Sequence, residues 1–253
     1  MKNQLTLSSL VERSGRLGLA LAGLMLSSIA GSAKPAEVLP PSSIPFGLSY
    51  AEWSAKYWQW SLGQATNHIE LVGETGVCSG PGSRVRFLAA ADIPGQGGVT
   101  IKTNHIVLGP DTPLFITVLS AYDDNTGCPT FGSLTAAELA DTNAANWTFV
   151  TETSCTIDGV AVTGLTDPAT TEYLTVSPPF SYTTAEKDNV LAGFFGEPCI
   201  AGGVTVYPAV AEGVYLMLSP FPPGRHTIHF VGRVTAGGSV VVDEDFTYDI
   251  SVL

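Results

Sequence analysis

Apolar and polar positions alternate most regularly at the end of the chain. From Asp245 to Val252 the even-numbered residues are apolar and the odd-numbered residues are polar. This period of two predicts a β-strand with one buried face and one wet face. Runs rich in β-branched residues and bounded by Gly and Pro predict further strands. These runs cover residues 84–90, 99–108, 113–122, 153–164 and 171–182.

Turn signals between the apolar runs indicate the fold class. Asp158-Gly159 lies between two apolar runs and predicts a hairpin, and Pro223-Gly224 predicts a second turn. Strands joined in this way, with no regular alternation of strands and helices, are typical of antiparallel sheets. We therefore predict a mainly β protein: an antiparallel two-sheet β-sandwich, immunoglobulin-like or jelly-roll-like, with an aromatic N-terminal helix and one or two short helical insertions.

Three segments have the pattern that begins a helix. A Ser or Thr followed three residues later by Glu forms a capping box, in which the two side chains satisfy otherwise unpaired backbone N–H groups. The chain has this pattern at Ser49–Glu52, Thr135–Glu138 and Thr183–Glu186. The first box begins the aromatic helix, and the other two begin the predicted insertions.

The aromatic helix allows two interpretations. Residues 49–60, SYAEWSAKYWQW, contain three of the four tryptophans. At 100° per residue the apolar side chains cover more than roughly 200°, whereas a surface helix needs an apolar stripe of only about 100°. The pattern therefore favours burial. The alternative is an exposed docking face, whose binding residues would be Trp53, Tyr57 and Trp60.

Residues 1–33 have the parts of a secretory signal peptide. Basic residues precede an apolar run at 17–30, and small residues offer a cleavage site after Ala30 or Ala33. The alternative is an uncleaved membrane anchor, for which the uncharged stretch only reaches the lower length limit. We predict cleavage, a secreted or periplasmic protein, and no membrane span in the mature chain.

The rest of the chain is predicted to form one domain with an acidic surface. The Pro-rich segment 34–47 is predicted as a linker, and residues 48–253 as a single β-sandwich domain. The whole chain has a formal net charge of −12, and without residues 1–33 the charge is −14, from 8 basic and 22 acidic residues. Such a surface repels phosphate groups, so we predict no nucleic-acid or direct membrane binding, and a protein or glycan as the partner.

The mature chain contains four cysteines, Cys78, Cys128, Cys155 and Cys199. An even number in an exported protein predicts two disulfides. Three pairings are possible, and we favour Cys128–Cys155 with Cys78–Cys199, because the first bond would tie down a long middle excursion. Zinc binding is the competing use, but the sequence has no C-x2-C pair.

Two groups of residues are candidates for metal binding. Asp123, Asp124 and Asn125 follow a predicted strand and could give oxygen ligands to calcium, although the EF-hand spacing is absent and a polar turn is the competing interpretation. His226 and His229 are three residues apart, so on a strand they point to opposite faces and cannot hold one metal ion. We expect one of these histidines to lie inward and hydrogen-bonded and the other at the surface.

Acidic residues of the last strand are the candidates for catalysis. Asp243, Asp245 and Asp249 are predicted to lie on one face. A glycosidase needs two carboxylates across a cleft, with their pKa values pushed apart, and neighbours on one exposed strand do not provide that arrangement. They are expected to keep the strand soluble and to discourage edge pairing. The sequence also has no G-x-S-x-G and no H-E-x-x-H motif.

Several segments together carry a resemblance to one family. They are residues 50–62, Asp158-Gly159, residues 177–182, residues 188–191, residues 215–232 (YLMLSPFPPGRHTIHFVG) and residues 246–252 (FTYDISV). In these segments the chain resembles a family of exported bacterial proteins of unknown function. The resemblance implies a compact, exported domain over most of the mature chain, and it transfers no catalytic residue.

These observations lead to a function hypothesis and an alternative. We predict an exported, non-catalytic β-sandwich protein that needs no cofactor and whose role is binding or association with the cell envelope. The alternative is an extracellular hydrolase that acts on a glycan or an ester, with acidic residues gathered from distant loops.

Overall fold

A computed structural model describes residues 36–65, 75–77, 84–88, 99–126, 132–191 and 200–253. The chain divides into two units, residues 1–33 and 34–253, and the description concerns the second unit. The helices are η1 (Pro45–Gly47), α1 (Tyr50–Leu62) and α2 (Ala136–Trp147). The strands are β1 (Val38–Leu39), β2 (Thr75–Val77), β3 (Arg86–Leu88), β4 (Val99–Leu108), β5 (Leu114–Asp124), β6 (Val150–Ile157), β7 (Val160–Ala161), β8 (Leu174–Val176), β9 (Phe180–Thr183), β10 (Thr205–Leu218), β11 (Gly224–Ala236) and β12 (Ser239–Val252).

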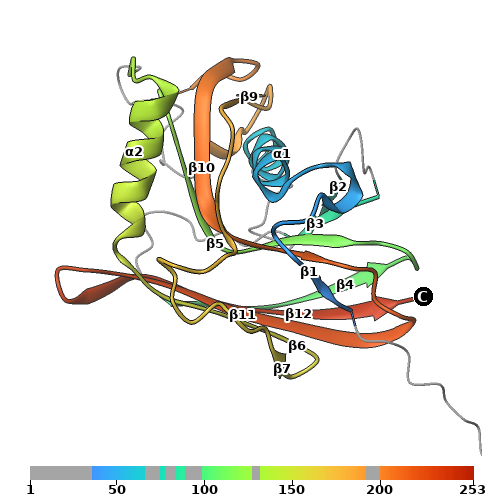
Figure 1. Ribbon diagram of the computed structural model, residues 1–253. Coiled ribbons are helices and arrows are strands. Elements are labelled where there is room, and N and C mark those ends of the chain that lie inside the picture. The colour runs from blue at the N-terminus through green and yellow to red at the C-terminus, as the bar shows by residue number, and fades with distance from the viewer. Residues whose placement is uncertain (1–35, 66–74, 78–83, 89–98, 127–131, 192–199) are drawn as a thin grey trace, which may run out of the picture. The chain divides into compact units, whose positions relative to one another are not determined.

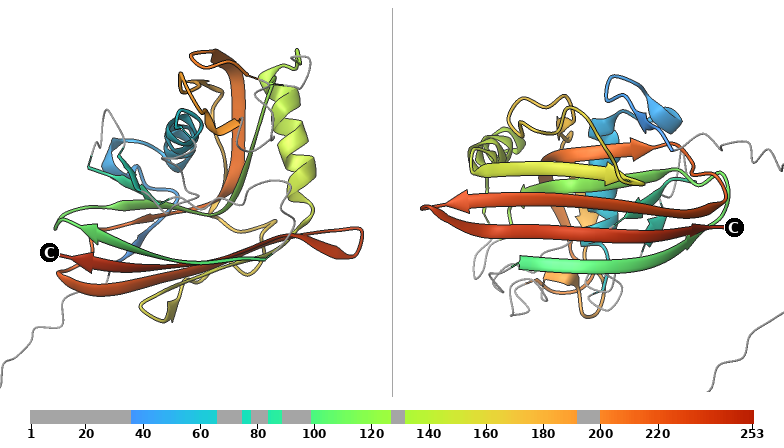
Figure 2. Two further views of the ribbon diagram at one scale, coloured as in Figure 1. Left: turned by 180° about the vertical axis from the view of Figure 1, so that it is seen from behind. Right: turned by 90° about the horizontal axis from the view of Figure 1, so that it is seen from below.

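The strands form two sheets, which confirms the mainly β class. One sheet has seven strands, in the order β1-β10-β5-β3-β2 with β8 and β9 also paired to β10. It bends through a sharp angle into a half-barrel (Figures 1 and 2), and we call it the curled sheet. The other sheet, in the order β4-β12-β11-β6-β7, is the five-stranded sheet. Because the first sheet curls, the arrangement differs from two flat sheets that face each other throughout.

The prediction that all strands are antiparallel is wrong, because each sheet contains one parallel pair. β3 runs parallel to β5 in the curled sheet, and β4 runs parallel to β12 in the five-stranded sheet. Turn signals report only on hairpins that join consecutive strands. β4 pairs with the last strand of the chain, so nothing local in the sequence reports the direction of that pair.

Helix α1 lies inside the angle of the curled sheet (Figure 1). Its N-terminus has the predicted capping box: the Ser49 backbone N–H donates to Glu52 Oε2 (2.8 Å), and the Glu52 N–H donates to Ser49 Oγ (3.3 Å). The side chains of Trp53 and Tyr57 are 0% and 1% exposed. The burial that the apolar arc favours is therefore confirmed for these two side chains.

Polar atoms of the buried aromatic residues find partners inside the core. Trp53 Nε1 donates to the Pro45 carbonyl oxygen (2.9 Å). The Tyr50 hydroxyl donates to the Leu39 carbonyl oxygen (2.6 Å) and accepts from the Met217 N–H (2.9 Å). Burial raises the pKa of Tyr50 far above its ordinary value, so this hydroxyl stays neutral and keeps both hydrogen bonds.

The segment that we predict as a linker takes part in the curled sheet. Val38 and Leu39 form β1 and pair with Leu218 and Met217 of β10. Pro45 is buried, and its carbonyl oxygen is the acceptor of the Trp53 ring. The proline-rich composition therefore marks an extended lead-in that packs against α1.

The curl depends on a close approach of β5 and β10. A Cβ atom on Gly213 would lie 2.3 Å from Ser120 Cβ, so a larger residue would force the two strands apart. Directly after this point the register shifts between Val214 and Tyr215, and a bulge of this kind bends and twists a strand. The bend turns the first part of β10 away from the five-stranded sheet, as Figure 1 shows.

The five-stranded sheet packs its apolar face on the curled sheet. Phe230, Phe246 and Tyr248 are buried there, and for Phe246 and Tyr248 the alternation at the end of the chain predicts it. At Gly232 an added Cβ atom would lie 2.9 Å from Leu119 Cβ, which marks a place where the two sheets almost touch.

Of the two predicted helical insertions, the structure describes α2. The second, predicted in residues 187–195, lies partly outside the described residues, and its described part is helical only at Val190 and Leu191. Thr135 caps α2 with the predicted box, and Trp147 anchors the other end by donating from Nε1 to the Pro168 carbonyl oxygen (2.9 Å). The predicted box at Thr183 is wrong, because Thr183 is the last residue of β9 and pairs with Thr205 of β10. Among the described residues, no helix combines the length and the apolar character needed to cross a membrane.

The position of α1 leads to a stability prediction. Replacing Trp53 with Ala removes a fully buried ring, and such truncations cost about 3–5 kcal/mol of unfolding free energy. Urea unfolding followed by circular dichroism measures this loss. Trp60→Ala is the matched control on the same helix, and it should cost less because Trp60 is only partly buried. Equal losses for the two variants would contradict this account of the core.

Candidate functional site

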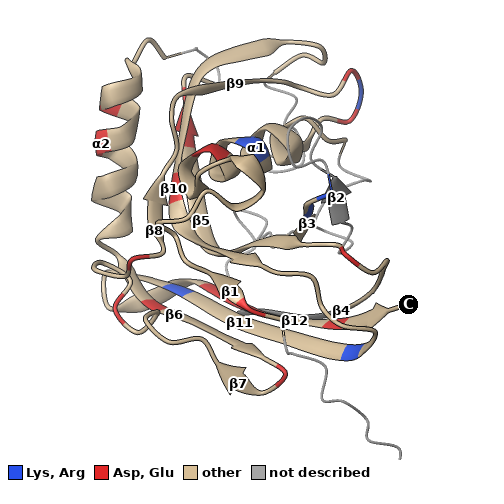
Figure 3. Cartoon of the chain, turned by 45° about the vertical axis from the view of Figure 1, so that its right-hand side comes forward, with Lys and Arg blue, Asp and Glu red and all other residues tan. Residues whose placement is uncertain are grey.

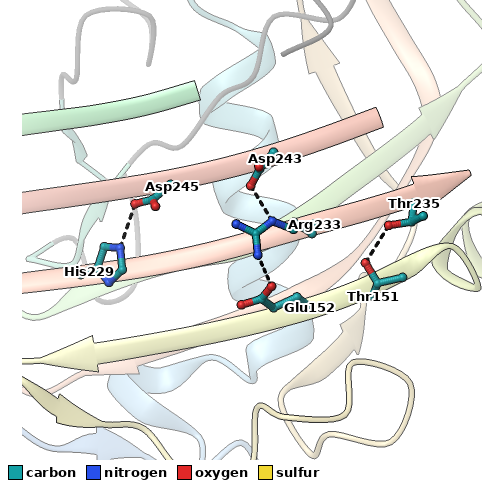
Figure 4. A network of polar contacts seen from close by, with 7 residues as sticks. All are labelled: Thr151, Glu152, His229, Arg233, Thr235, Asp243 and Asp245. Atoms are coloured by element: carbon teal, nitrogen blue, oxygen red, sulfur yellow. Dashed lines mark hydrogen bonds and ion pairs between the residues drawn. The ribbon is translucent and has the colours of Figure 1, made fainter. Parts of the chain in front are cut away.

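The outer face of the five-stranded sheet carries a row of charged and polar side chains. Arg233 of β11 lies between two acidic residues: its Nε donates to Asp243 Oδ1 of β12 (2.8 Å), and its Nη1 donates to Glu152 Oε2 of β6. Strand register explains the contact, because Arg233 is the direct cross-strand neighbour of both carboxylates. Figure 4 shows the three side chains reaching across three strands.

Two histidine–aspartate pairs extend this row. His229 Nε2 lies 2.8 Å from Asp245 Oδ1, and His105 Nδ1 of β4 lies 3.2 Å from Asp249 Oδ2. We call these side chains together the polar row: Glu152, Arg233, Asp243, His229, Asp245, His105 and Asp249. The row therefore crosses four strands of one sheet, from β6 to β4.

The polar row keeps contact with solvent. The side chains of Arg233 and His229 are 34% and 40% exposed. A hydroxyl pair lies beside them, because Thr151 Oγ1 and Thr235 Oγ1 are 3.0 Å apart (Figure 4). The face thus offers hydrogen-bond donors and acceptors side by side, which is the chemistry needed to bind a polar partner.

The two histidines of the RHTIHF segment point to opposite faces, as their spacing predicts. His226 is nearly buried, with Nδ1 2.8 Å from Asp158 Oδ2 and Nε2 2.8 Å from the Pro222 carbonyl oxygen. His229 belongs to the polar row on the outer face. His226 therefore fastens the Asp158-Gly159 hairpin to β11 and is not part of the candidate site.

The aromatic residues that we considered for docking are placed mainly in the core. Trp53 and Tyr57 pack against Phe115, with ring centroids 6.2 and 6.5 Å away. Trp60 is partly exposed and packs on Phe87 at 5.6 Å. Only Trp60 of the three retains surface that a partner could contact.

The three calcium candidates at the end of β5 do not form one site. Asp124 is occupied by hydrogen-bond donors: the Thr126 N–H (2.7 Å) and hydroxyl on Oδ1, and the Tyr182 hydroxyl on Oδ2 (2.6 Å). Asn125 exchanges two hydrogen bonds with the backbone of Leu134, at 2.8 and 2.7 Å. Asp123 faces the other side of the strand, and its buried Oδ2 has no hydrogen-bond partner.

Cys155 is a free, buried thiol, so the predicted Cys128–Cys155 disulfide is absent from this structure. Cys155 lies on the inward side of β6, between Thr153 and Ile157, where it packs in the core. Burial raises the pKa of this thiol to about 12, which makes it unreactive at neutral pH. The other three cysteines, and with them the Cys78–Cys199 pairing, lie outside the described residues.

Sequence reasoning found only part of the polar row. The alternation at the end of the chain places Asp243, Asp245 and Asp249 on one face, and the structure has them there. It missed Arg233 and Glu152, which lie on separate strands. Cross-strand register was the signal that could have found them, and it depends on pairing between distant segments.

No protein-family model, no curated protein and no solved structure matches this chain.

The burial of Cys155 leads to a prediction about thiol reactivity. In the folded protein, without reductant, Cys155 should resist alkylation for hours, because its thiol is buried and protonated. After denaturation without reductant it should be alkylated, and peptide mass spectrometry identifies the modified residue. A Cys155 that stays unmodified after denaturation would show that it is oxidised and would contradict the assignment.

Proposed function

We propose that the protein is an exported, non-catalytic β-sandwich-type binding protein of the cell envelope, which presents the polar row to a protein or glycan partner. One observation carries this proposal: three groups of paired, partly exposed charged and polar side chains lie across four strands of a single sheet face. The N-terminal signal pattern supports export. The net negative charge of the sequence supports a partner other than a nucleic acid, because an acidic surface repels phosphate groups.

The chemistry of the row indicates what kind of partner fits. Arg233 is already neutralised by Glu152 and Asp243, so it holds the carboxylates in position instead of offering a free positive charge. In the part of the chain that the structure describes, Asp245 and Asp249 are each paired through one oxygen with a histidine, and the second oxygen of each carboxylate can accept from a further donor. Acidic residues outnumber basic ones over the described elements (Figure 3). Sugar hydroxyls, or a protein surface rich in donors, would complement this face.

The alternative function, a hydrolase, also has one observation behind it. Burial raises the pKa of the Glu212 carboxyl, and burial together with the Asp124 charge raises that of Asp123, and a raised pKa suits a general acid. The Glu212 side chain points to the face of β10 away from α1, and only 6% of the residue is exposed. A glycan cannot reach so deeply buried a carboxyl group without a local opening of the fold, so Glu212 favours a role other than glycan hydrolysis.

The proposal predicts that the polar row governs binding. We expect the mature protein to bind isolated cell-envelope material or arrayed glycans, and Asp245→Ala/Asp249→Ala to weaken binding by about tenfold or more, since truncating a paired charge at an interface costs several kcal/mol. Sedimentation with the envelope fraction and array fluorescence measure this effect.

Asp141→Ala/Glu172→Ala is the matched control, because it removes two exposed carboxylates outside the polar row. It should bind like the unmodified protein. Equal binding by both double variants would contradict the proposed face. Release of sugars or acids from the same material by the purified protein would instead support the hydrolase.

A further inference from the structure

Three buried oxygen atoms in the described part of the chain have no hydrogen-bond partner. They are Asp123 Oδ2, Asn143 Oδ1 and Glu212 Oε2. No other side-chain nitrogen or oxygen atom of the described residues is both fully buried and unpartnered. Buried polar groups nearly always have partners in folded proteins, so each of the three needs an explanation.

Two of these residues share one face of the β5–β10 ladder. Asp123 lies opposite Val210, and Glu212 lies two residues further along β10, opposite Ala121. Side chains two residues apart on a strand, and those directly across a ladder, point to the same side. Asp123 and Glu212 therefore occupy neighbouring rows of one face.

This face is the one that points away from α1. The intervening residues, Tyr122 and Ala211, belong to the apolar cluster on the α1 side. The Tyr122 side chain points toward α1, because its ring packs on Trp58 of that helix with centroids 4.6 Å apart. The side chains of Asp123 and Glu212 therefore point away from α1. The two carboxylates consequently lie between the curled sheet and whatever covers its outer side.

Helix α2 covers that side and brings the third oxygen. Figure 1 shows α2 running alongside β10 and β5. Asn143 of α2 is 1% exposed, and its Nδ2 donates to the Val210 carbonyl oxygen (2.9 Å). The amide is thus fixed over the row that contains Asp123 and Val210, and its Oδ1 is left without a donor.

All three unpartnered atoms are acceptors, so the missing partner must be positively charged or a hydrogen-bond donor. Removal from water raises the pKa of both carboxyl groups, and for Asp123 the neighbouring Asp124 charge adds to it, so uncompensated negative charge is disfavoured here. Carboxylate, amide and backbone carbonyl oxygens are the ligands of hard cations, and calcium takes six to eight of them with flexible geometry. Sulfur and imidazole, which zinc prefers, do not contribute to this set.

We propose that Asp123, Glu212 and Asn143 form a binding site for a calcium-class divalent cation between α2 and the β5–β10 ladder. The site differs from the sequence-based candidate, since Asp124 and Asn125 take no part in it. Within the described ranges no three His, Cys, Asp or Glu residues are placed to hold one metal ion. The proposed site therefore has only two charged ligands, and water completes the shell.

A site with two carboxylates binds calcium with modest affinity. Extracellular modules have dissociation constants of about 10⁻⁴–10⁻³ M, and we expect this range here. Bound calcium would join α2 to the sheet, because its ligands come from both. The inference does not depend on the polar row, which lies on the other sheet.

Calcium-dependent stability of the mature protein tests the site. After removal of metal with EDTA, adding CaCl2 at about ten times the dissociation constant should raise Tm by roughly 3–5 °C, and MgCl2 at the same concentration should raise it less. Isothermal titration should give one calcium ion per chain.

Isosteric variants locate the ion. Asp123→Asn and Glu212→Gln keep the shape of the side chain and should abolish the calcium-dependent shift. Asp141→Asn, on the exposed side of α2, should leave the shift unchanged. Far-UV circular dichroism of each variant checks that the fold is intact.

Two results would overturn the proposal. One is a calcium shift that survives in both Asp123→Asn and Glu212→Gln, which would place the ion elsewhere. The other is an unmodified protein whose Tm does not respond to calcium, which by itself rules out the site. Higher stability of both neutral variants than of the unmodified protein would then mean that the carboxyl groups are protonated in the folded protein.

Discussion

The burial of one aromatic helix in the bend of a sheet is the interaction on which the rest of this structure depends. Trp53 and Tyr57 of α1 lie against Phe115 and Tyr215 of the curled sheet, and Phe115 and Tyr215 stack with centroids 5.3 Å apart. A flat sheet could contact only one side of so apolar a helix. By curling, the sheet covers most of the arc, and the lead-in through β1 and η1 covers more of it.

This arrangement decides what every other surface can do. Because α1 fills the inner side of the curled sheet, the outer side is left to pack on the five-stranded sheet and on α2. The five-stranded sheet then has its apolar face covered, and its second face stays wet and carries the polar row around Arg233. The contact with α2 is different, since Asn143 places a buried polar side chain between the helix and β10.

Local patterns in the sequence predicted the elements that local interactions define. Both boxes that cap described helices, at Ser49 and Thr135, were visible as residue spacing, and the final strand was visible as alternation. The same spacing at Thr183 was misleading, because pairing of Thr183 with Thr205 outweighs the capping preference. Two features depend on contacts between distant segments, which no local pattern contains. They are the parallel pairing of β4 with β12 and the burial of Cys155 as a free thiol in the core. For the candidate site, the sequence indicated the aspartates of β12 but not their partner Arg233, which requires the register.

Hydrogen–deuterium exchange of the mature protein, followed by mass spectrometry, is the most direct test of the central role of α1. If the curled sheet is held by this helix, the backbone amides of α1 should exchange as slowly as those of β5 and β10, and only through global unfolding. Fast exchange of α1 while β5 and β10 remain protected would contradict the account, because the sheet would then keep its form without the helix.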